Sequence, residues 1–266
     1  MLEVKPYPAR ARREDAAAEK GGSVAATLAL LRLLGSSGRP LGVNAIARDL
    51  SLAPSSCFKI LKQLQRDDFV DFDVRTKCYT LGSGAIELAR RALDPTQAFS
   101  LVRERLEQVA ESGALAIGFW RSIHQSRLVL AGFVEGSSPM RIHMSIGQRV
   151  PMLVGAVGRA AAAKLQFSEA QLYREFAQLR WQAAPDFNAY VAQVHEARRC
   201  GYAVDRDNFA AGVTTVAVAI PSPGGAVSYG ISGIMFSGRC DEKMIAKIGA
   251  DLVDVADWAA SRLVAR

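Results

Sequence analysis

The sequence predicts two domains, a small and mostly α-helical N-terminal domain followed by a larger α+β domain. A length of 266 residues is sufficient for two domains, and half of the residues are hydrophobic. Apolar residues recur at helical spacing between residues 23 and 64, whereas helical and strand-like segments alternate after residue 96. Asp94-Pro95 interrupts the pattern between these two parts, because the residue before a proline is disfavoured in a helix.

Two short helices joined by a turn are predicted between Pro40 and Leu64. Apolar residues at spacings of three and four give each helix one buried stripe: Val43, Ile46, Ala47 and Leu50, then Cys57, Ile60, Leu61 and Leu64. Ser51-Leu52 interrupts the period, and Pro54 is tolerated in the first turn of the second helix. The pattern is therefore helix, turn, helix.

The outer face of the second helix has a composition that suits double-stranded DNA. It carries Ser55, Ser56, Phe58, Lys59 and Lys62. Hydroxyl and ammonium groups can reach phosphate oxygens, and an aromatic ring can lie on a sugar or a thymine methyl group. We interpret these five residues as candidate DNA contacts.

A β-hairpin is predicted directly after the second helix. Residues 69–72 and 77–81 have strand composition and flank a polar tip, where Arg75 and Lys77 lie. Helix-turn-helix plus hairpin is the winged variant, in which the second helix enters the major groove and the wing contacts the DNA backbone. A helical packing motif with a solvated basic face is the alternative, and the hairpin favours DNA binding.

The net charge supports a polyanionic partner for the first part of the chain. The protein carries +7 with a pI near 9.4. Residues 1–95 contain 15 Lys and Arg against 11 Asp and Glu, and residues 96–266 contain 18 against 15. The first third therefore holds more than half of the excess positive charge.

The predicted boundaries follow from these patterns. Residues 1–22 lack an apolar period and are expected to be disordered, with Arg10, Arg12 and Arg13 as either a DNA arm or a solvated tail. The winged domain comprises residues 23–82 and begins with a helix from Ser23 to Leu34, whose buried face would hold Val24, Leu28, Leu31 and Leu34. A linker helix is expected over residues 83–95.

The remaining residues, 96–266, are predicted to form an α+β domain. Helices are expected over 99–111, 155–165, 168–179, 188–200 and 241–263, and strands over 115–121, 127–134, 140–144, 202–205, 213–220 and 226–234, with a loop over 146–152. The start of the helix at Gly155 would leave backbone N–H groups available for an anion.

The sequence gives no indication of a catalytic, metal or cofactor site. The four cysteines and three histidines are scattered without ligand spacing, so we expect reduced thiols and no metal. The usual nucleophile-elbow, zinc-protease and phosphate-loop motifs are absent, and Glu87 replaces the third glycine of a dinucleotide motif that starts at Gly82. No signal peptide or membrane span is predicted, and we expect a cytoplasmic protein.

Four segments in fixed order resemble the IclR family of bacterial transcription regulators. They are residues 40–64 with the wing, residues 147–151 with Gly158-Arg159-Ala160, residues 201–205 with Gly212-Val213, and Ile231-Ser232-Gly233. Together they cover nearly everything from Ser23 onward. The resemblance implies a winged helix-turn-helix domain and a GAF/PAS-like domain that binds a small organic effector and oligomerises.

The resemblance also implies partners and site residues. Such proteins bind palindromic operators as homodimers or dimers of dimers, and control catabolic operons as repressors or activators. Matched by position, the effector would contact the backbone of Ala156 and Val157 and the side chains of Asp205, Thr215 and Ser232. The alternative is that Asp205 is a turn acceptor and the two hydroxyls satisfy local backbone groups.

Departures from the family pattern indicate an apolar cavity. Gly230 stands where relatives can carry serine, and Leu153-Val154-Gly155 replaces more polar residues. An aromatic or otherwise bulky carboxylic acid is therefore expected, with candidate walls from Phe119, Trp120, Phe133 and Met144. A small-acid-processing enzyme and a ligand-free dimerising regulator are the alternative functions.

Overall fold

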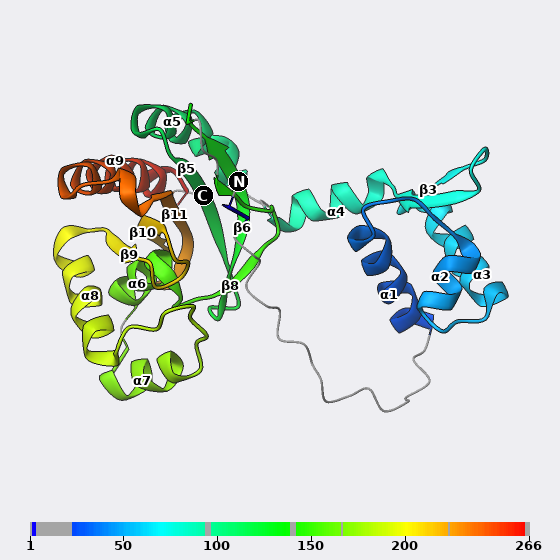
Figure 1. The fold of residues 1–266 in the computed structure, drawn as a ribbon, viewed down its shortest axis with the longest axis horizontal. Helices are drawn as coiled ribbons and strands as arrows, with labels where there is room; N and C mark the ends of the chain where they lie inside the picture. Colours follow the sequence, from blue (N-terminus) through cyan, green and yellow to red (C-terminus); the bar gives the residue numbers. More distant parts are fainter. Residues whose placement is uncertain are drawn as a thin grey trace. The chain divides into compact units, whose positions relative to one another are not determined.

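The computed structural model describes residues 2–3, 23–93, 97–138, 142–165, 167–222 and 224–263 (Figure 1). The described residues form two compact units. One holds the described residues up to Ala92 except Leu2–Glu3, and the other holds Leu2–Glu3 together with the described residues from Leu93 onward. Arg10, Arg12 and Arg13, the candidate DNA arm, lie outside the described residues.

The N-terminal unit is a helix-turn-helix with a three-stranded sheet, which confirms the predicted winged fold. Its elements are α1 (Ser23–Ser36), β2 (Leu41–Gly42), α2 (Val43–Asp49), α3 (Pro54–Arg66), β3 (Val70–Asp73), β4 (Cys78–Leu81) and α4 (Ser83–Leu93). The strand order is β2-β4-β3, with both pairs antiparallel. The short strand β2 was not predicted, because its two residues carry no period of their own.

Helices α2 and α3 pack through the predicted stripes. Ile46, Ala47, Cys57, Leu61 and Leu64 are buried in one core with residues of α1 and the hairpin. Pro54 occupies the first turn of α3, where its missing N–H is not needed, and Ala53 accepts the first hydrogen bonds of the helix from Ser56 and Cys57.

The predicted buried face of α1 is wrong at two positions. Leu30 and Leu34 are buried, whereas Val24 is 73% exposed and Leu28 is 46% exposed. Leucines are so frequent in this helix that several faces satisfy the helical period, and only tertiary packing decides between them. Two large apolar side chains on α1 are consequently left on the surface of this unit.

The C-terminal unit is built on a six-stranded antiparallel sheet with the order β8-β6-β5-β11-β10-β9. Its elements are β1 (Leu2–Glu3), α5 (Ala98–Gly113), β5 (Ala116–Ile123), β6 (Arg127–Glu135), β7 (Ile142–His143), β8 (Arg149–Pro151), α6 (Gly155–Lys164), α7 (Glu169–Ala177), α8 (Phe187–Cys200), β9 (Ala203–Arg206), β10 (Val213–Pro221), β11 (Val227–Phe236), a 3-10 turn (Ser237–Arg239) and α9 (Glu242–Leu263). This arrangement confirms the predicted α+β class.

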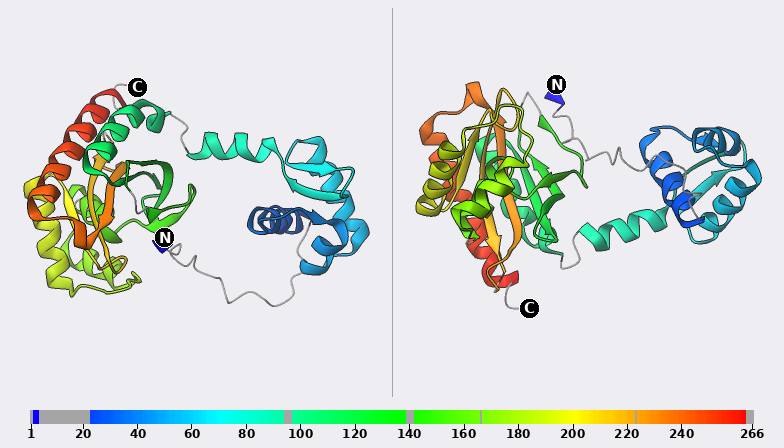
Figure 2. Two further views of the ribbon diagram at one scale, coloured as in Figure 1. Left: turned by 45° about the horizontal axis from the view of Figure 1, so that its top comes forward. Right: turned by 90° about the horizontal axis from the view of Figure 1, so that it is seen from below.

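Helices cover both faces of this sheet (Figure 2). Helices α5 and α9 pack on one face and enclose a core that includes Phe119. Helix α6 packs on the other face with α8 outside it, and that core includes Trp120. Strand β5 thus sends adjacent aromatic side chains into different cores, as the alternation of a strand requires.

Two local predictions, for residues 1–22 and for residues 146–152, need correction. Leu2–Glu3 is not unstructured, because it pairs in parallel with Ile142–His143. The expected loop over 146–152 contains β8, which pairs with β6 after a turn in which Gly147 has a φ of 86°. The strand expected over 140–144 is confirmed at Ile142–His143, which form β7, whereas Met144 lies outside the strand and residues 140–141 lie outside the described residues.

Candidate DNA-binding face and effector cavity

The outer face of α3 presents all five candidate DNA contacts to solvent. Ser55, Ser56, Phe58, Lys59 and Lys62 are exposed, and Phe58 is 47% exposed despite its apolar ring. Arg66 continues the same face at the C-terminal end of the helix. Two hydroxyls and three cationic side chains therefore lie on the side of α3 opposite its buried stripe. All five are hydrogen-bond donors for which phosphate oxygens are suitable acceptors.

The Lys62 side chain extends from α3 toward the wing, and its ammonium group lies near one aromatic ring of each. Its ammonium nitrogen is 5.7 Å from the centre of the Phe58 ring and 5.8 Å from the centre of the Phe72 ring. The same nitrogen donates a 3.3 Å hydrogen bond to Gln65. Cation–π contacts on two sides restrain this side chain and so fix the position of its charge.

The tip of the wing is organised by Asp73. Its carboxylate accepts hydrogen bonds from the backbone N–H of Arg75 at 2.8 Å, the backbone N–H of Thr76 at 3.4 Å and the Thr76 hydroxyl at 2.9 Å. These bonds, led by the one from Arg75, hold the pKa of Asp73 below its ordinary value of 3.8. Arg75 and Lys77 are exposed at this tip.

A cavity lies in the C-terminal unit between the sheet and the start of α6. Its empty volume, including the part open to solvent, is about 500 Å³. The residues that line it are mostly apolar: Trp120, Ile142, Met144, Val150, Val154, Gly155, Ala156, Val157, Phe209, Ala210, Val213, Thr215, Ser232 and Ile234. A mostly apolar lining with a few polar groups suits a small organic molecule.

Four of the five candidate effector residues line this cavity. Ala156 and Val157 contribute the first turn of α6, Thr215 comes from β10 and Ser232 from β11. The structure thus brings together residues from three elements separated by up to 76 positions. Among the candidate walls, Trp120 and Met144 line the cavity, whereas Phe119 lies in the opposite core and Phe133 packs nearby without lining it.

The first turn of α6 supplies the polar end of the cavity. Val154 precedes the helix without a side-chain cap, and the first intrahelical bond runs from the Gly158 N–H to the Val154 carbonyl. The N–H groups of Gly155, Ala156 and Val157 consequently have no acceptor within the helix. Gly158 is required here, because a Cβ at that position would lie 2.1 Å from the Leu153 carbonyl carbon.

Two contacts shape the opposite wall. The indole N–H of Trp120 donates a 2.8 Å hydrogen bond to the Ser232 hydroxyl. A Cβ at Gly230 would lie 2.5 Å from Cγ2 of Val157, so the valine occupies the space that a larger residue 230 would need. Apolar groups therefore fill the space beside Gly230.

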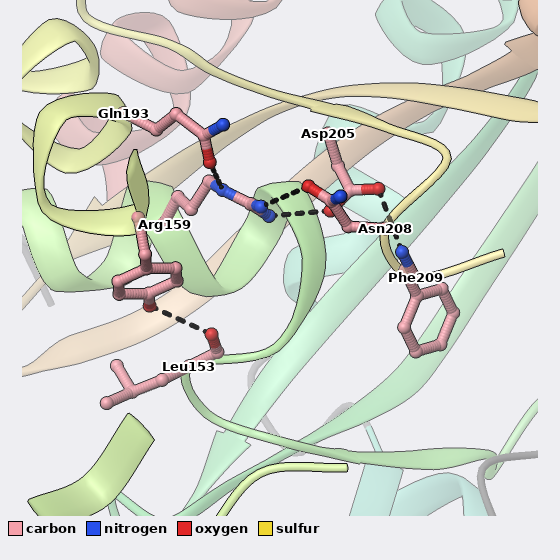
Figure 3. Close-up of polar contacts among 7 residues, drawn as sticks. Leu153, Arg159, Gln193, Asp205, Asn208 and Phe209 are labelled. Carbon is pink, nitrogen blue, oxygen red and sulfur yellow. Dashed lines mark hydrogen bonds and ion pairs between the residues drawn. The ribbon is translucent and has the colours of Figure 1, made fainter. Parts of the chain in front are cut away.

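Asp205 does not line the cavity. It is buried, and its carboxylate pairs with the guanidinium of Arg159 at 2.6 Å (Figure 3). Its other oxygen accepts a 3.1 Å hydrogen bond from the backbone N–H of Phe209. The family resemblance implied that this aspartate contacts the effector, whereas its carboxylate is paired with Arg159 and is not among the groups that line the cavity.

Arg159 belongs to the family-like segment Gly158-Arg159-Ala160, but no role was predicted for its side chain. It is fully buried on α6 and donates to Gln193 at 2.6 Å, Asp205 at 2.6 Å and Asn208 at 2.8 Å. Its guanidinium carbon is also 5.2 Å from the Trp181 ring centre and 5.3 Å from that of Tyr190. The sequence signal for such a role is a single arginine within an alanine-rich helix. An arginine on a helix that packs in the core is buried, and a buried charge must be paired and hydrogen-bonded.

Tyr190 links this cluster to the start of α6. Its hydroxyl donates a 2.9 Å hydrogen bond to the Leu153 carbonyl, directly before the helix. Burial raises the pKa of this phenol, and the nearby Arg159 opposes that shift without cancelling it. Tyr190 is therefore a neutral donor that fixes the backbone at the entry to α6.

None of the described helices is long and apolar enough to cross a membrane. Among the described residues, no group of three or more His, Cys, Asp or Glu side chains is arranged to hold a metal ion.

Comparison with known proteins identifies the family. The model for the bacterial transcriptional regulator IclR C-terminal domain matches residues 91–260, and the model for the IclR helix-turn-helix domain matches residues 23–74. The chain is 26% identical to the HTH-type transcriptional repressor AllR of Escherichia coli K12 over 263 residues, which cover 96% of this chain and 95% of AllR.

Solved structures share the fold. The IclR protein of Thermotoga maritima superposes with a TM-score of 0.78 at 19% identity, over 91% of this chain and 98% of that one. An IclR homologue from Microbacterium hydrocarbonoxydans, solved in complex with 4-hydroxybenzoate, gives 0.73 at 15% identity, over 90% and 99%. The chain belongs to the IclR family: it is a DNA-binding transcription regulator and not an enzyme.

Proposed function

We propose that this regulator senses a small aromatic carboxylic acid in its C-terminal cavity and controls a catabolic operon in response. The observation that carries the proposal is the composition of the cavity. Apolar side chains line most of it, while unpaired N–H groups at the start of α6 and the hydroxyls of Thr215 and Ser232 provide its polar points. That combination matches a flat apolar ring with a carboxylate at one end.

The ligand would lie with its carboxylate at α6 and its ring along the sheet. The N–H groups of Ala156 and Val157 and the positive end of the helix dipole would bind the carboxylate. The ring would pack between Trp120 and Phe209, which line the cavity. Thr215 would offer a hydroxyl to a ring substituent, because it lies on β10 with no other hydrogen bond described for its side chain.

A relative supports this ligand class. The Microbacterium homologue binds 4-hydroxybenzoate, a ring with a carboxylate and a hydroxyl. Its identity to this chain is only 15%, so it supports the fold and the class of molecule that such a cavity accepts. The choice of an aromatic acid here depends on the apolar lining of this chain.

The DNA-binding unit is proposed to act as a dimer on a palindromic operator in the cytoplasm. Val24 and Leu28 on α1 and Ile86 and Leu88 on α4 are large apolar residues exposed on this unit. A second copy could cover them and pair two recognition helices, either as a dimer or as a dimer of dimers. Ser55, Ser56, Phe58, Lys59, Lys62, Arg75 and Lys77 are the proposed DNA contacts.

Effector binding would act by linkage. A ligand that binds one arrangement of the paired units more tightly shifts the fraction of protein able to span both half-sites. The sign of regulation then depends on which arrangement the ligand favours and on where the operator lies.

Calorimetric titration of the purified protein tests the ligand class. We expect 4-hydroxybenzoate or benzoate to bind and a two-carbon acid such as glyoxylate to bind at least about tenfold more weakly, because it leaves the apolar walls unfilled. Thr215→Val should weaken binding of the hydroxylated acid. Thr214→Val is the matched control, since that side chain bonds to Ser237 outside the cavity.

Two results would contradict the proposal. Tighter binding of glyoxylate than of both aromatic acids would assign the cavity to small polar acids. Binding of none of the acids, combined with operator affinity that no acid alters, would favour a ligand-free regulator whose C-terminal unit serves only to oligomerise.

A further inference from the structure

The Arg159 cluster joins three elements behind the cavity. We define it as Arg159 on α6, Gln193 on α8, Asp205 on β9 and Asn208 in the loop 207–212, which connects β9 to β10 (Figure 3). Arg159 donates to a different acceptor through each of its three guanidinium nitrogens. Few positions satisfy three acceptors at once, so the guanidinium fixes their relative placement.

The loop 207–212 carries part of the cavity wall. Phe209 and Ala210 line the cavity. The Phe209 ring lies against the start of α6, since its Cβ and Cγ would be 3.7 Å from a Cβ placed on Gly155. The position of this ring therefore determines how much room is left beside the helix N-terminus.

The cluster holds that loop at two points. Asn208 is tied through its side chain to the guanidinium, and the Phe209 N–H is tied to the Asp205 carboxylate that the guanidinium orients. The loop is also tied at its outer end by Asp207, whose carboxylate accepts from the Gly212 N–H and the Ser237 hydroxyl. The Ala211 N–H also donates to the Gln182 side chain, and the Asn208 carbonyl accepts from the Ala183 N–H. The cluster adds to these bonds the tethers that come from α6 and β9.

We propose that Arg159 is a positioning residue for the effector cavity: through Asp205 and Asn208 it fixes the Phe209 wall, and so sets the size of ligand that the cavity accepts. Asp205 acts through this cluster and does not contact the ligand. Only the ligand arm of the test below rests on the proposed function, because the state of the loop can be measured without any ligand.

Amide hydrogen exchange of the ligand-free protein tests the restraint. Asn208→Ala removes one tether and leaves the ion pair in place, and we expect exchange in the peptide covering 207–212 to become about fivefold to tenfold faster. Asn208→Asp restores an acceptor for Arg159 and should return exchange to near the wild-type rate. Arg159→Lys keeps the charge but loses the three-way contact, and should behave like Asn208→Ala.

Glu242→Gln provides the matched control. It weakens the exposed pair between Arg206 and Glu242, adjacent to the same loop but away from the cavity. Unchanged exchange of 207–212 in Asn208→Ala would overturn the proposal. So would an equal acceleration in the control, or an acceleration spread evenly over α6 and β10, since each indicates general loosening of the domain.

The ligand arm compares two acids of different size. In Asn208→Ala we expect the affinity ratio of 6-hydroxy-2-naphthoate to 4-hydroxybenzoate to rise about fivefold or more over wild type, because a released Phe209 vacates space. Phe209→Ala should give the same shift. An unchanged ratio in both variants overturns the size role. Binding of neither acid to the wild type would overturn the aromatic ligand class, and the exchange rates would then decide the positioning role alone.

Discussion

The Trp120 indole and the Ser232 hydroxyl share a 2.8 Å hydrogen bond across neighbouring strands at the wall of the cavity. The serine was expected to face a ligand, and its hydroxyl is already occupied as an acceptor while its own proton remains available for donation. Ser232 therefore orients the aromatic wall of the cavity that it lines, and its hydroxyl proton is not used by the bond to Trp120.

Replacement of Ser232 should have a structural and a functional effect. Ser232→Ala leaves the buried Trp120 N–H without an acceptor, which costs about 1–3 kcal/mol. We expect the C-terminal unit to melt several degrees lower and the tryptophan emission to shift, with weaker effector binding. Ser228→Ala on the same strand is the control, and a Ser232→Ala melting temperature equal to that of wild type would contradict the assigned bond.

Removal of the lysines on α3 should weaken DNA binding through lost phosphate contacts. Lys59→Ala with Lys62→Ala is expected to lower operator affinity and to reduce the slope of log affinity against log salt concentration by about 1 to 2. Gel-shift titrations at several salt concentrations measure both quantities. Lys243→Ala with Lys247→Ala on α9 is the charge-matched control, and an equal loss in both pairs would reject α3 as the recognition helix.

Acidification should release the tip of the wing. The pKa of Asp73 is lowered in the folded state, so the ionised carboxylate stabilises the turn fully above the ordinary value of 3.8. That contribution is lost as the pH falls through the lower, folded pKa. Amide chemical shifts of Arg75 and Thr76 should titrate below pH 3.8, and Asp73→Asn should abolish this titration. A midpoint above 3.8 would contradict the hydrogen-bonded turn.

The contact between residues 230 and 157 predicts a rescue. Gly230→Ala places a methyl group 2.5 Å from Val157 Cγ2 and should destabilise the domain by about 1–3 kcal/mol. Val157→Ala removes the obstacle, so the double variant should recover most of that loss. Urea unfolding of the four proteins gives the coupling energy, and additive single effects would show that the two positions do not compete for space.

The parts of the fold that can be predicted from the sequence are those that local patterns decide. The stripes of α2 and α3 and the polar tip of the wing are encoded within a few residues, and the fold class followed from them. Strands β2 and β8 are too short to carry a period, and they exist because a distant strand offers hydrogen-bond partners. The exposed position of Leu28 likewise depends on packing that a leucine-rich helix does not specify by itself.

The same distinction between local pattern and tertiary packing applies to the candidate site. Family likeness pointed to Ala156, Val157, Thr215 and Ser232, which the fold gathers around one cavity. It could not show that Asp205 is paired, because Arg159 lies 46 positions away and reaches the aspartate only after α6 packs on β9 and β10. Similarly, Phe119 and Trp120 are adjacent aromatic residues on β5. Their side chains point to opposite faces of the sheet, so Phe119 packs under α5 and α9 while Trp120 lies on the face that carries the cavity.

Among the described residues that line the cavity, none bears a group that gains or loses a proton near neutrality. An acid held there would meet only fixed dipoles, whose strength does not vary with acidity. For the proposed carboxylic acid, the response of this regulator should accordingly be constant across the physiological range, and should decline only when the acid itself becomes protonated.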